Sequence, residues 1–284
     1  MAEEIVFRKF TEWLAEDVPF WDVTSEIIPP EASCEAVVMA KEDGVAACCE
    51  DLFPILEKMG FTVKILKKSG EEFRKGDRIM WIKGNMRKLM GIERLLLNIL
   101  SQAFGVATLT KAFVEKARRI NPNVKIAATR KVKPGFQYFE KKAIIAAGGD
   151  THRLNLSDMI LIKENHLKYF KSVSDAVEKA RELASFSKKI EVEVADAEDA
   201  VKAAEAGADI IMLDNCEPEK AKRAIEMLRE KGLRNKVLVE VSGGVRLENL
   251  EEYVKAGPDV ISSGELTHSA KFIDISLEVT KVGK

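Results

Sequence analysis

The second half of the chain alternates short apolar runs with longer amphipathic stretches, and this alternation constrains the fold more than any other feature. Each run is rich in valine and isoleucine, as buried strands are. Strands and helices in alternation predict a parallel sheet covered by helices. The runs are Val124–Thr129, Met159–Ile162, Ile190–Val194, Ile210–Leu213, Val237–Val241 and Val260–Ser262, and the helical stretches include Ser174–Ser185, Ala197–Ala206, Pro218–Lys231 and Leu247–Ala256.

An open sheet and a closed barrel both fit this alternation, and the ends of the runs favour the barrel. Nearly every run ends on a charged or small polar side chain, and α/β barrel enzymes place their chemistry at the carboxyl ends of the strands. Because six runs are visible and a full barrel has eight strands, we predict an incomplete α/β barrel. The ends are Arg130–Lys131, Lys163, Glu193, Asp214, Ser242–Gly243–Gly244 and Ser262–Ser263–Gly264.

The first hundred residues mix helices and strands. Helical periodicity covers Phe7–Ala15 and Asp51–Met59, and strand patterns cover Cys34–Ala40 and Asp77–Gly84. A long apolar helix is predicted over Gly91–Ala117, with a kink near Gly105.

Composition excludes several classes of protein. A formal net charge of −1 gives no sign of binding to nucleic acid or membranes. The N-terminus lacks a signal pattern, and no apolar stretch approaches the roughly 20 residues that span a bilayer. The four cysteines form no C-x-x-C pair. We therefore expect reduced thiols and a cytoplasmic location.

Basic residues follow three consecutive segments of the predicted barrel. Thr129–Arg130–Lys131 follows the first run, His152–Arg153 lies in the next loop, and Lys163 ends the run MILIK. Arginine binds carboxylate and phosphate through two N–H groups, so this cluster suits a small substrate with several negative charges.

Acidic residues and glycine–serine turns follow the later strands. Glu191 and Glu193 share one strand face and Asp214 ends the next strand. These carboxylates suit either Mg²⁺ and sugar hydroxyls or an ion network with the lysines, and the pattern leaves both open. In barrels, turns such as Ser242–Gly243–Gly244 and Ser262–Ser263–Gly264 often bind phosphate through backbone N–H groups. We expect His166 and His268 to orient the backbone and Cys216 to pack.

Together these motifs resemble the quinolinate phosphoribosyltransferase family. The resemblance extends from Glu16–Asp17 to Ser269, and no single motif carries it. Its motifs are Glu93–Arg94, Leu97–Asn98, Thr129–Arg130–Lys131, Pro134–Gly135, Gly148–Gly149, His152–Arg153, Leu161–Ile162–Lys163, Asn165–His166, Glu191–Val192–Glu193, Met212–Leu213–Asp214–Asn215, Ser242–Gly243–Gly244, Ile261–Ser262 and Gly264–Ser269.

This resemblance implies a domain plan and a reaction. An N-terminal α/β sandwich would cover residues 1–108, joined by 271–284, and the barrel would cover 109–270. Quinolinate and phosphoribosyl pyrophosphate would give nicotinate mononucleotide, CO₂ and pyrophosphate, with Mg²⁺ as cofactor, in de novo NAD synthesis. The chain would form a homodimer or hexamer.

The resemblance also assigns roles to residues. Arg130, His152, Arg153 and Lys163 would bind quinolinate, and Arg94 would reach the pocket of the neighbouring subunit. Lys131 would lie near the pyrophosphate, Glu193 and Asp214 at the ribose and Mg²⁺, and the two glycine–serine turns at the 5′-phosphate. Together with Thr129, these are the predicted binding residues. The predicted catalytic residues are Lys131, Lys163, Glu193 and Asp214.

Several positions depart from the family pattern and keep alternatives open. Gln137 lacks an expected cation and Asp150 adds an anion, which lowers the positive charge expected at the base-binding end, whereas Val132 changes no charge. Trp21 and Phe104 depart from the pattern as well. A related transferase for another aromatic base, similar to the pyrophosphorylase-like proteins found with molybdate transporters, is one alternative. A nucleotide-binding barrel without turnover is another. A barrel aldolase is less consistent, because a Schiff-base lysine needs an apolar surround and Lys163 lies among arginines.

Overall fold

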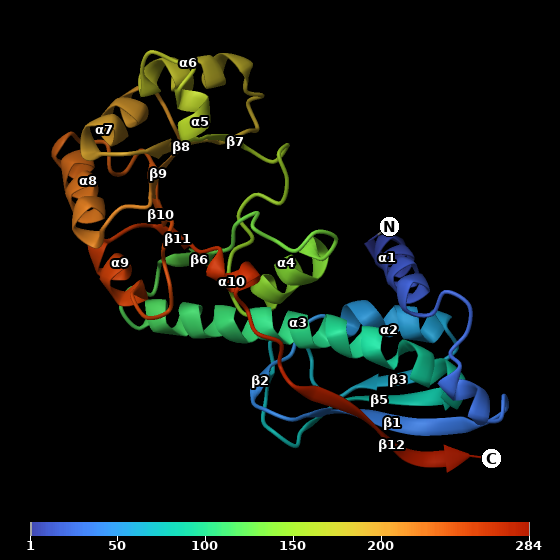
Figure 1. Cartoon of the computed structure of the whole chain (residues 1–284). Helices are drawn as coiled ribbons and strands as arrows, with labels where there is room; N and C mark the ends of the chain where they lie inside the picture. Colours follow the sequence, from blue (N-terminus) through green and yellow to red (C-terminus); the bar gives the residue numbers. More distant parts are fainter. Residues whose placement is uncertain (1, 284) are drawn as a thin grey trace. The chain divides into compact units, whose positions relative to one another are not determined.

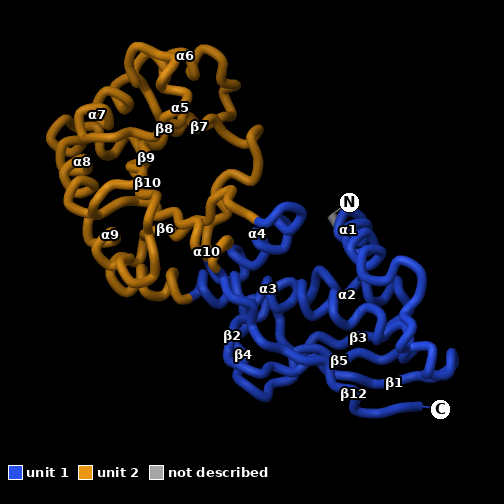
Figure 2. Tube along the Cα trace, in the orientation of Figure 1, with its two compact units in different colours: residues 1–111, 133–148, 270–284 blue, residues 112–132, 149–269 orange. Residues whose placement is uncertain are grey.

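The computed structural model describes residues 2–283 and divides into two compact units, shown in separate colours in Figure 2. The first unit runs to Lys111, includes Lys133–Gly148 and resumes at Ala270. The second unit consists of Ala112–Val132 and Gly149–Ser269.

A six-stranded parallel sheet forms the centre of the second unit, in the order β6-β11-β10-β9-β8-β7 (Figure 1). Its strands are buried on both faces, which explains their unbroken Val/Ile runs. Among the described strands, β6 and β7 end the series without pairing to each other, so the predicted incomplete α/β barrel is confirmed. The strands are β6 (Lys125–Ala127), β7 (Ile160–Ile162), β8 (Ile190–Val194), β9 (Ile210–Asp214), β10 (Leu238–Ser242) and β11 (Val260–Ser262).

Helices follow the strands and pack on the outside of this sheet (Figure 1). Ser172 and Asp196 cap α6 and α7 by accepting backbone N–H groups with their side chains. The helices are α6 (Val173–Leu183), α7 (Ala197–Glu205), α8 (Pro218–Glu230) and α9 (Leu250–Ala256), with the short α5 (Glu164–Leu167) and α10 (Glu265–His268) after β7 and β11.

An antiparallel sheet in the order β12-β1-β5-β3 forms the first unit, and the C-terminal strand β12 pairs with β1 along its whole length (Figure 1). The strands are β1 (Ser33–Ala40), β2 (Gly44–Val45), β3 (Thr62–Ile65), β4 (Glu72–Phe73), β5 (Arg78–Asn85) and β12 (Ile275–Gly283), with β2 and β4 as a separate pair. The helices are α1 (Ala2–Asp17), the 3-10 turn η1 (Thr24–Ile27), α2 (Cys49–Lys58), α4 (Gln137–Ala146) and the start of α3 (Met86–Arg118).

The segment 133–148 corrects the predicted domain plan, which placed it in the barrel. It belongs to the first unit because α4 carries aromatic side chains that are buried there. Phe139 is buried, and its ring centroid lies 6.2 Å from that of Trp13. The Tyr138 hydroxyl donates a hydrogen bond to the Asp51 carboxylate at 2.6 Å. Alternation of strands and helices cannot reveal which sheet a given helix covers.

The long helix α3 runs through Gly105 without a break. Gly105 is required for a steric reason. A Cβ atom there would overlap the backbone carbonyl of Lys271, which passes directly over the helix. Gly91, on the same helix, has no neighbour within 4 Å of a built Cβ atom.

By length and composition alone, α3 passes the test for a membrane-spanning helix, contrary to the expectation from the sequence. Two-thirds of its most apolar window (67%) is buried inside the protein. Leu89, Leu96, Leu100 and Phe104 are all fully buried. This burial is typical of a core helix, which passes the same test.

Alanine at the two glycines of α3 should have opposite effects. We expect Gly91→Ala to stabilise the protein by roughly 0.5–1 kcal/mol through helix propensity. Gly105→Ala should destabilise it by about 1–3 kcal/mol because the methyl group must displace the Lys271 backbone. Denaturant unfolding measures both free energies, and equal effects at the two sites would contradict the close approach.

Candidate functional site

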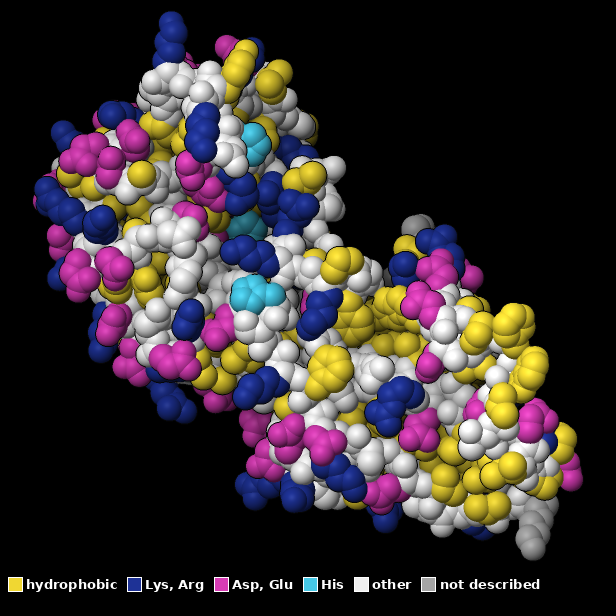
Figure 3. Space-filling model, viewed as in Figure 1, with side chains coloured by type: hydrophobic (Ala, Val, Ile, Leu, Met, Phe, Trp, Pro, Cys, Tyr) yellow, Lys and Arg dark blue, Asp and Glu magenta, His cyan; other side chains and the backbone are white. Residues whose placement is uncertain are grey.

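A cavity of about 310 Å³ lies at the carboxyl ends of the parallel strands in the second unit. Figure 3 shows Lys and Arg side chains gathered around a hollow on this face, with histidine among them. Most of the predicted binding residues line this cavity: Thr129, Arg130, Lys131, His152, Arg153, Lys163, Glu193, Asp214 and Ser242.

Two arginines form the basic end of this cavity. Burial, followed by the neighbouring Arg130 guanidinium, lowers the pKa of Arg153. Like charges held together in a partly buried pocket are unfavourable unless an anion neutralises them. This end of the cavity therefore suits a ligand with carboxylate groups, which arginine binds through paired N–H donors.

His152 adopts a left-handed backbone conformation (φ 54°), which is uncommon for a residue other than glycine. The Asp150 carboxylate accepts its N–H at 2.8 Å and stabilises the turn. Ring atom Nε2 lies 3.2 Å from Glu240 and 3.5 Å from Glu191. Burial lowers the pKa of His152, while the two carboxylates act in the opposite direction. Backbone strain of this kind is typical of functional sites.

Glu193 and Asp214 form an acidic wall of the cavity, and Lys163 lies beside them. The Lys163 ammonium group lies 2.5 Å from Glu193, which also accepts the backbone N–H of Glu164 at 3.2 Å. Burial, followed by the Glu193 charge, raises the pKa of Asp214. Two carboxylates thus face one partly buried space, where oxygen ligands suit a hard cation or sugar hydroxyls.

A second cavity, of about 480 Å³, lies between the two glycine–serine turns and shares Thr129, Lys131 and Ser242 with the first. Gly243 and Gly244 both have positive φ, which aligns successive N–H groups as anion-binding turns do. A Cβ atom on Gly243 would overlap the Asn215 side chain. Ser263 and Gly264 line the opposite turn, so this cavity contains the predicted phosphate-binding residues.

Several residues that line the two cavities were not predicted. Glu240 lines the first, and Arg246 and His268 line the second. Glu240 lies two residues before Ser242 on β10, so strand periodicity places both on one face and could have identified it. Arg246 lies in a loop, where no periodic signal exists.

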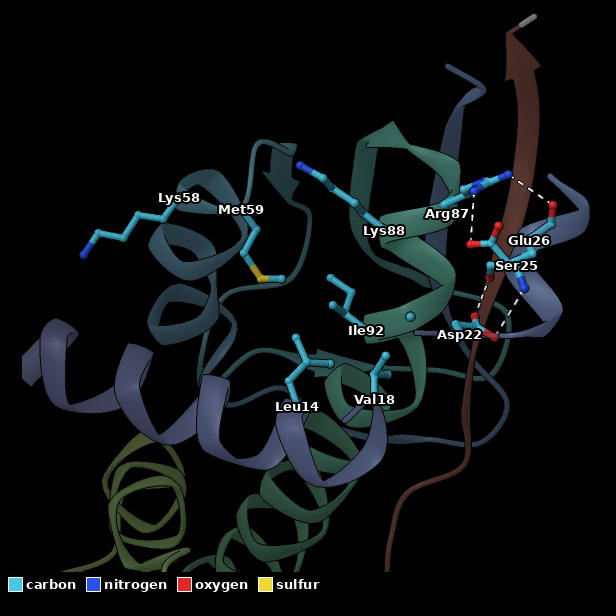
Figure 4. A pocket seen from close by; sticks show the side chains of 11 residues that line it. Leu14, Val18, Asp22, Ser25, Glu26, Lys58, Met59, Arg87, Lys88 and Ile92 are labelled. Atoms are coloured by element: carbon cyan, nitrogen blue, oxygen red, sulfur yellow. Dashed lines mark hydrogen bonds and ion pairs between the residues drawn. The ribbon is translucent and has the colours of Figure 1, made fainter. Parts of the chain in front are cut away.

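Arg94 is the one predicted binding residue outside both cavities. It lies on α3 in the first unit, and the described residues that line the two cavities all belong to the second unit. The first unit has its own cavity, of about 520 Å³, between α1, α2 and α3 (Figure 4). Leu14 and Ile92 point into it, and Arg87 at its rim is paired with Glu26. It contains none of the predicted binding residues.

Comparison with known proteins shows which family the chain resembles. The model of the quinolinate phosphoribosyl transferase C-terminal domain matches residues 106–278, and that of the N-terminal domain matches residues 22–104. A probable nicotinate-nucleotide pyrophosphorylase [carboxylating] from Archaeoglobus fulgidus is 46% identical over 262 residues, covering 92% of this chain and 99% of the relative. Its counterpart from Methanothermobacter thermautotrophicus is 41% identical, covering 94% and 96%.

A solved structure gives the same result. The nicotinate-nucleotide pyrophosphorylase from Francisella tularensis superimposes with a TM-score of 0.90 at 33% identity, covering 98% of this chain and 97% of that one. The two family models, the related sequences and the solved structure therefore all indicate the same family, and together they cover nearly the whole chain. The chain belongs to the quinolinate phosphoribosyl transferase family.

Proposed function

We propose that the protein is a decarboxylating quinolinate phosphoribosyltransferase. It joins quinolinate to phosphoribosyl pyrophosphate and releases pyrophosphate, CO₂ and nicotinate mononucleotide, a step of de novo NAD synthesis. The observation that carries the proposal is the pair of adjoining cavities. One has adjacent arginines that suit a dicarboxylate, and the other has glycine turns that suit a phosphate.

Arg130, Arg153, His152 and Lys163 bind the two carboxylates of the base. These side chains share one cavity, and the first two suit paired contacts with carboxylate. The positions that depart from the family pattern, Val132, Gln137 and Asp150, do not line this cavity. Asp150 bonds to the His152 backbone instead, and Gln137 lies on α4 in the first unit. Within the second unit, neither Val132 nor Asp150 therefore adds its side chain to the cavity lining, which favours quinolinate.

The chemistry begins at C1 of the ribose. The pyridine nitrogen attacks C1 as the C1–O bond to pyrophosphate breaks, and positive charge develops on the sugar. Glu193 and Asp214 stabilise this charge, while Lys131 neutralises the departing pyrophosphate. The product ring is a pyridinium, so the electron pair left by loss of CO₂ from C2 is stabilised by the adjacent nitrogen, and C2 then takes up a proton.

Mg²⁺ fits the donor set at this wall. Glu193 and Asp214 face one partly buried space, and the charge of Glu193 adds to the effect of burial in raising the pKa of Asp214. A divalent cation relieves such repulsion, and carboxylate oxygen is its preferred ligand. When bound, Mg²⁺ supplies charge neutralisation for the pyrophosphate.

The working enzyme is a homodimer or a hexamer, in which Arg94 of the partner subunit completes the base-binding end. Support comes from the resemblance to the family, because Arg94, on α3, matches an arginine that family members supply across the dimer interface. The enzyme acts in the cytoplasm, which suits the four cysteines, all of them free thiols.

The decisive experiment supplies the protein with phosphoribosyl pyrophosphate, Mg²⁺ and either quinolinate or nicotinate. We expect nicotinate mononucleotide and one CO₂ per turnover with quinolinate only, and no product after chelation of Mg²⁺. Product from another base alone would support the alternative transferase. Nucleotide binding without product from any base would support a non-catalytic barrel.

Alanine at Lys163 should remove most of the activity. Its ammonium group lies in the pocket and pairs with Glu193, so its loss removes a substrate contact and frees a catalytic carboxylate. We expect kcat/KM for quinolinate to fall by about 100-fold or more, the usual cost of losing one charged group at a reacting centre. Lys179→Ala, which breaks a matched Lys–Glu pair at 2.7 Å on the surface of α6, should leave activity unchanged. Full activity of the Lys163 variant would contradict the assignment.

Alanine at Gly243 should weaken binding of phosphoribosyl pyrophosphate. A methyl group strains the backbone, which is in the left-handed region at this residue, and it overlaps the Asn215 side chain. The turn must therefore shift. We expect the KM for phosphoribosyl pyrophosphate to rise about tenfold, equivalent to 1.4 kcal/mol. Gly257→Ala is the control, because Gly257 has the same positive φ but open space around a built Cβ atom. If both variants raise KM equally, strain alone is the cause and the turn has no special role.

A further inference from the structure

Glu240 is a carboxylate in a mainly apolar strand. It lies in the middle of β10 and is 2% exposed, between the buried Val239 and Val241. Its side chain borders the 310 Å³ cavity, and it also borders a separate cavity of about 540 Å³ together with His152 and Arg153. A buried acid is strongly unfavourable unless its oxygens are bonded, so its partners indicate its role.

Each oxygen of Glu240 has a specific partner. The Ser262 hydroxyl donates to Oε1 at 2.5 Å, and Nε2 of His152 lies 3.2 Å from Oε2. The hydroxyls of Ser262 and Ser242 are 2.9 Å apart. Because Ser262 gives its one proton to Glu240, Ser242 must be the donor in this second bond. A continuous chain thus runs from the glycine turn at Ser242 to the imidazole ring.

The other side of the imidazole ring is also held. The backbone N–H of Arg153 donates to Nδ1 at 2.7 Å. A ring that accepts at Nδ1 carries its proton on Nε2, which points at Glu240. The Nε2 lone pair is then occupied, so His152, Glu191 and Glu240 do not form a cation site although they lie close together.

Glu191 is the less suitable partner for this ring. Its nearer oxygen is 3.5 Å from Nε2, and within residues 2–283 no hydrogen bond fixes the rotamer of its side chain. Glu240 is closer, and Ser262 fixes its rotamer.

We propose that Glu240 is a positioning residue that orients His152 for binding of the aromatic base. It accepts the Nε2 proton and fixes the ring plane. Since the Arg153 N–H bonds to the same ring, Glu240 also fixes the turn that presents Arg153. The proposal rests on the proposed function, in which His152 and Arg153 bind the carboxylates of quinolinate.

Two substitutions of Glu240 distinguish its role in orienting the His152 ring from the mere loss of a buried negative charge. Glu240→Gln keeps an oxygen for Nε2–H, and its amide group can donate to Ser262, whose hydroxyl reverses direction. Glu240→Met fills a similar volume but accepts nothing. We expect the Met variant to raise the KM for quinolinate at least about tenfold, the usual cost of one unpaired buried donor. The Gln variant should stay within about threefold, and the KM for phosphoribosyl pyrophosphate should change less than about twofold in both.

A matched control tests whether any hydroxyl–carboxylate bond has this effect. Ser69 donates to Glu50 at 2.5 Å in the first unit, away from both cavities of the site. Glu50→Gln should leave both KM values unchanged. Equal losses in the Gln and Met variants, or equal changes in the KM of both substrates, would overturn the proposal.

A second readout needs no activity. The chain has three histidines, so long-range ¹H–¹⁵N NMR can resolve each ring, with His152 assigned from the missing signal of His152→Asn. We expect His152 to show a protonated Nε2 in the wild type and in Glu240→Gln. In Glu240→Met, its signals should shift while those of His166 and His268 stay fixed. An unchanged His152 spectrum in the Met variant would overturn the proposal, even if the wild type failed to use quinolinate.

Discussion

The register of the parallel sheet in the second unit is the constraint on which the site depends. β9 and β10 pair so that Asp214 lies directly opposite Ser242, and β8 and β9 pair so that Glu193 lies opposite Met212. Carboxyl ends that share one edge bring acidic and phosphate-binding groups together although they are far apart in sequence. A shift of one residue in any of these strands would turn its functional side chain to the opposite face. The hydrophobic runs therefore position the chemistry as well as forming the core.

Charge in the pocket is balanced in two different ways. At the exposed rim, Lys163 and Glu193 pair directly, and a substrate can displace such a pair because water still reaches it. In the interior, Glu240 is held by a hydroxyl and an imidazole that both belong to the protein. The rim is thus suited to exchange partners during turnover, while the interior keeps the rim groups in place.

Much of this arrangement could be predicted from the sequence, because strand-end residues obey simple rules. The six Val/Ile runs and the polar residues after them predict the barrel, and every predicted pocket residue except Arg94 lines one of the two cavities. Contacts between segments distant in sequence could not be predicted. The burial of α4 through Phe139, the approach of Lys271 to Gly105, and the Glu240–His152 pair all depend on tertiary packing. Asp150 was interpreted as an added charge, but its carboxylate stabilises a left-handed turn.

The pairing of β12 with β1 has a consequence for synthesis on the ribosome. β1 is formed from residues 33–40, but its outer partner consists of residues 275–283. Domains generally fold as units while the chain emerges. Here the first unit must wait with one edge of its sheet unpaired until nearly the whole chain has been made. During that interval β1 presents open backbone N–H and C=O groups, the kind of edge to which other strands add. Translation thus completes the second unit before the first, although the first begins the chain.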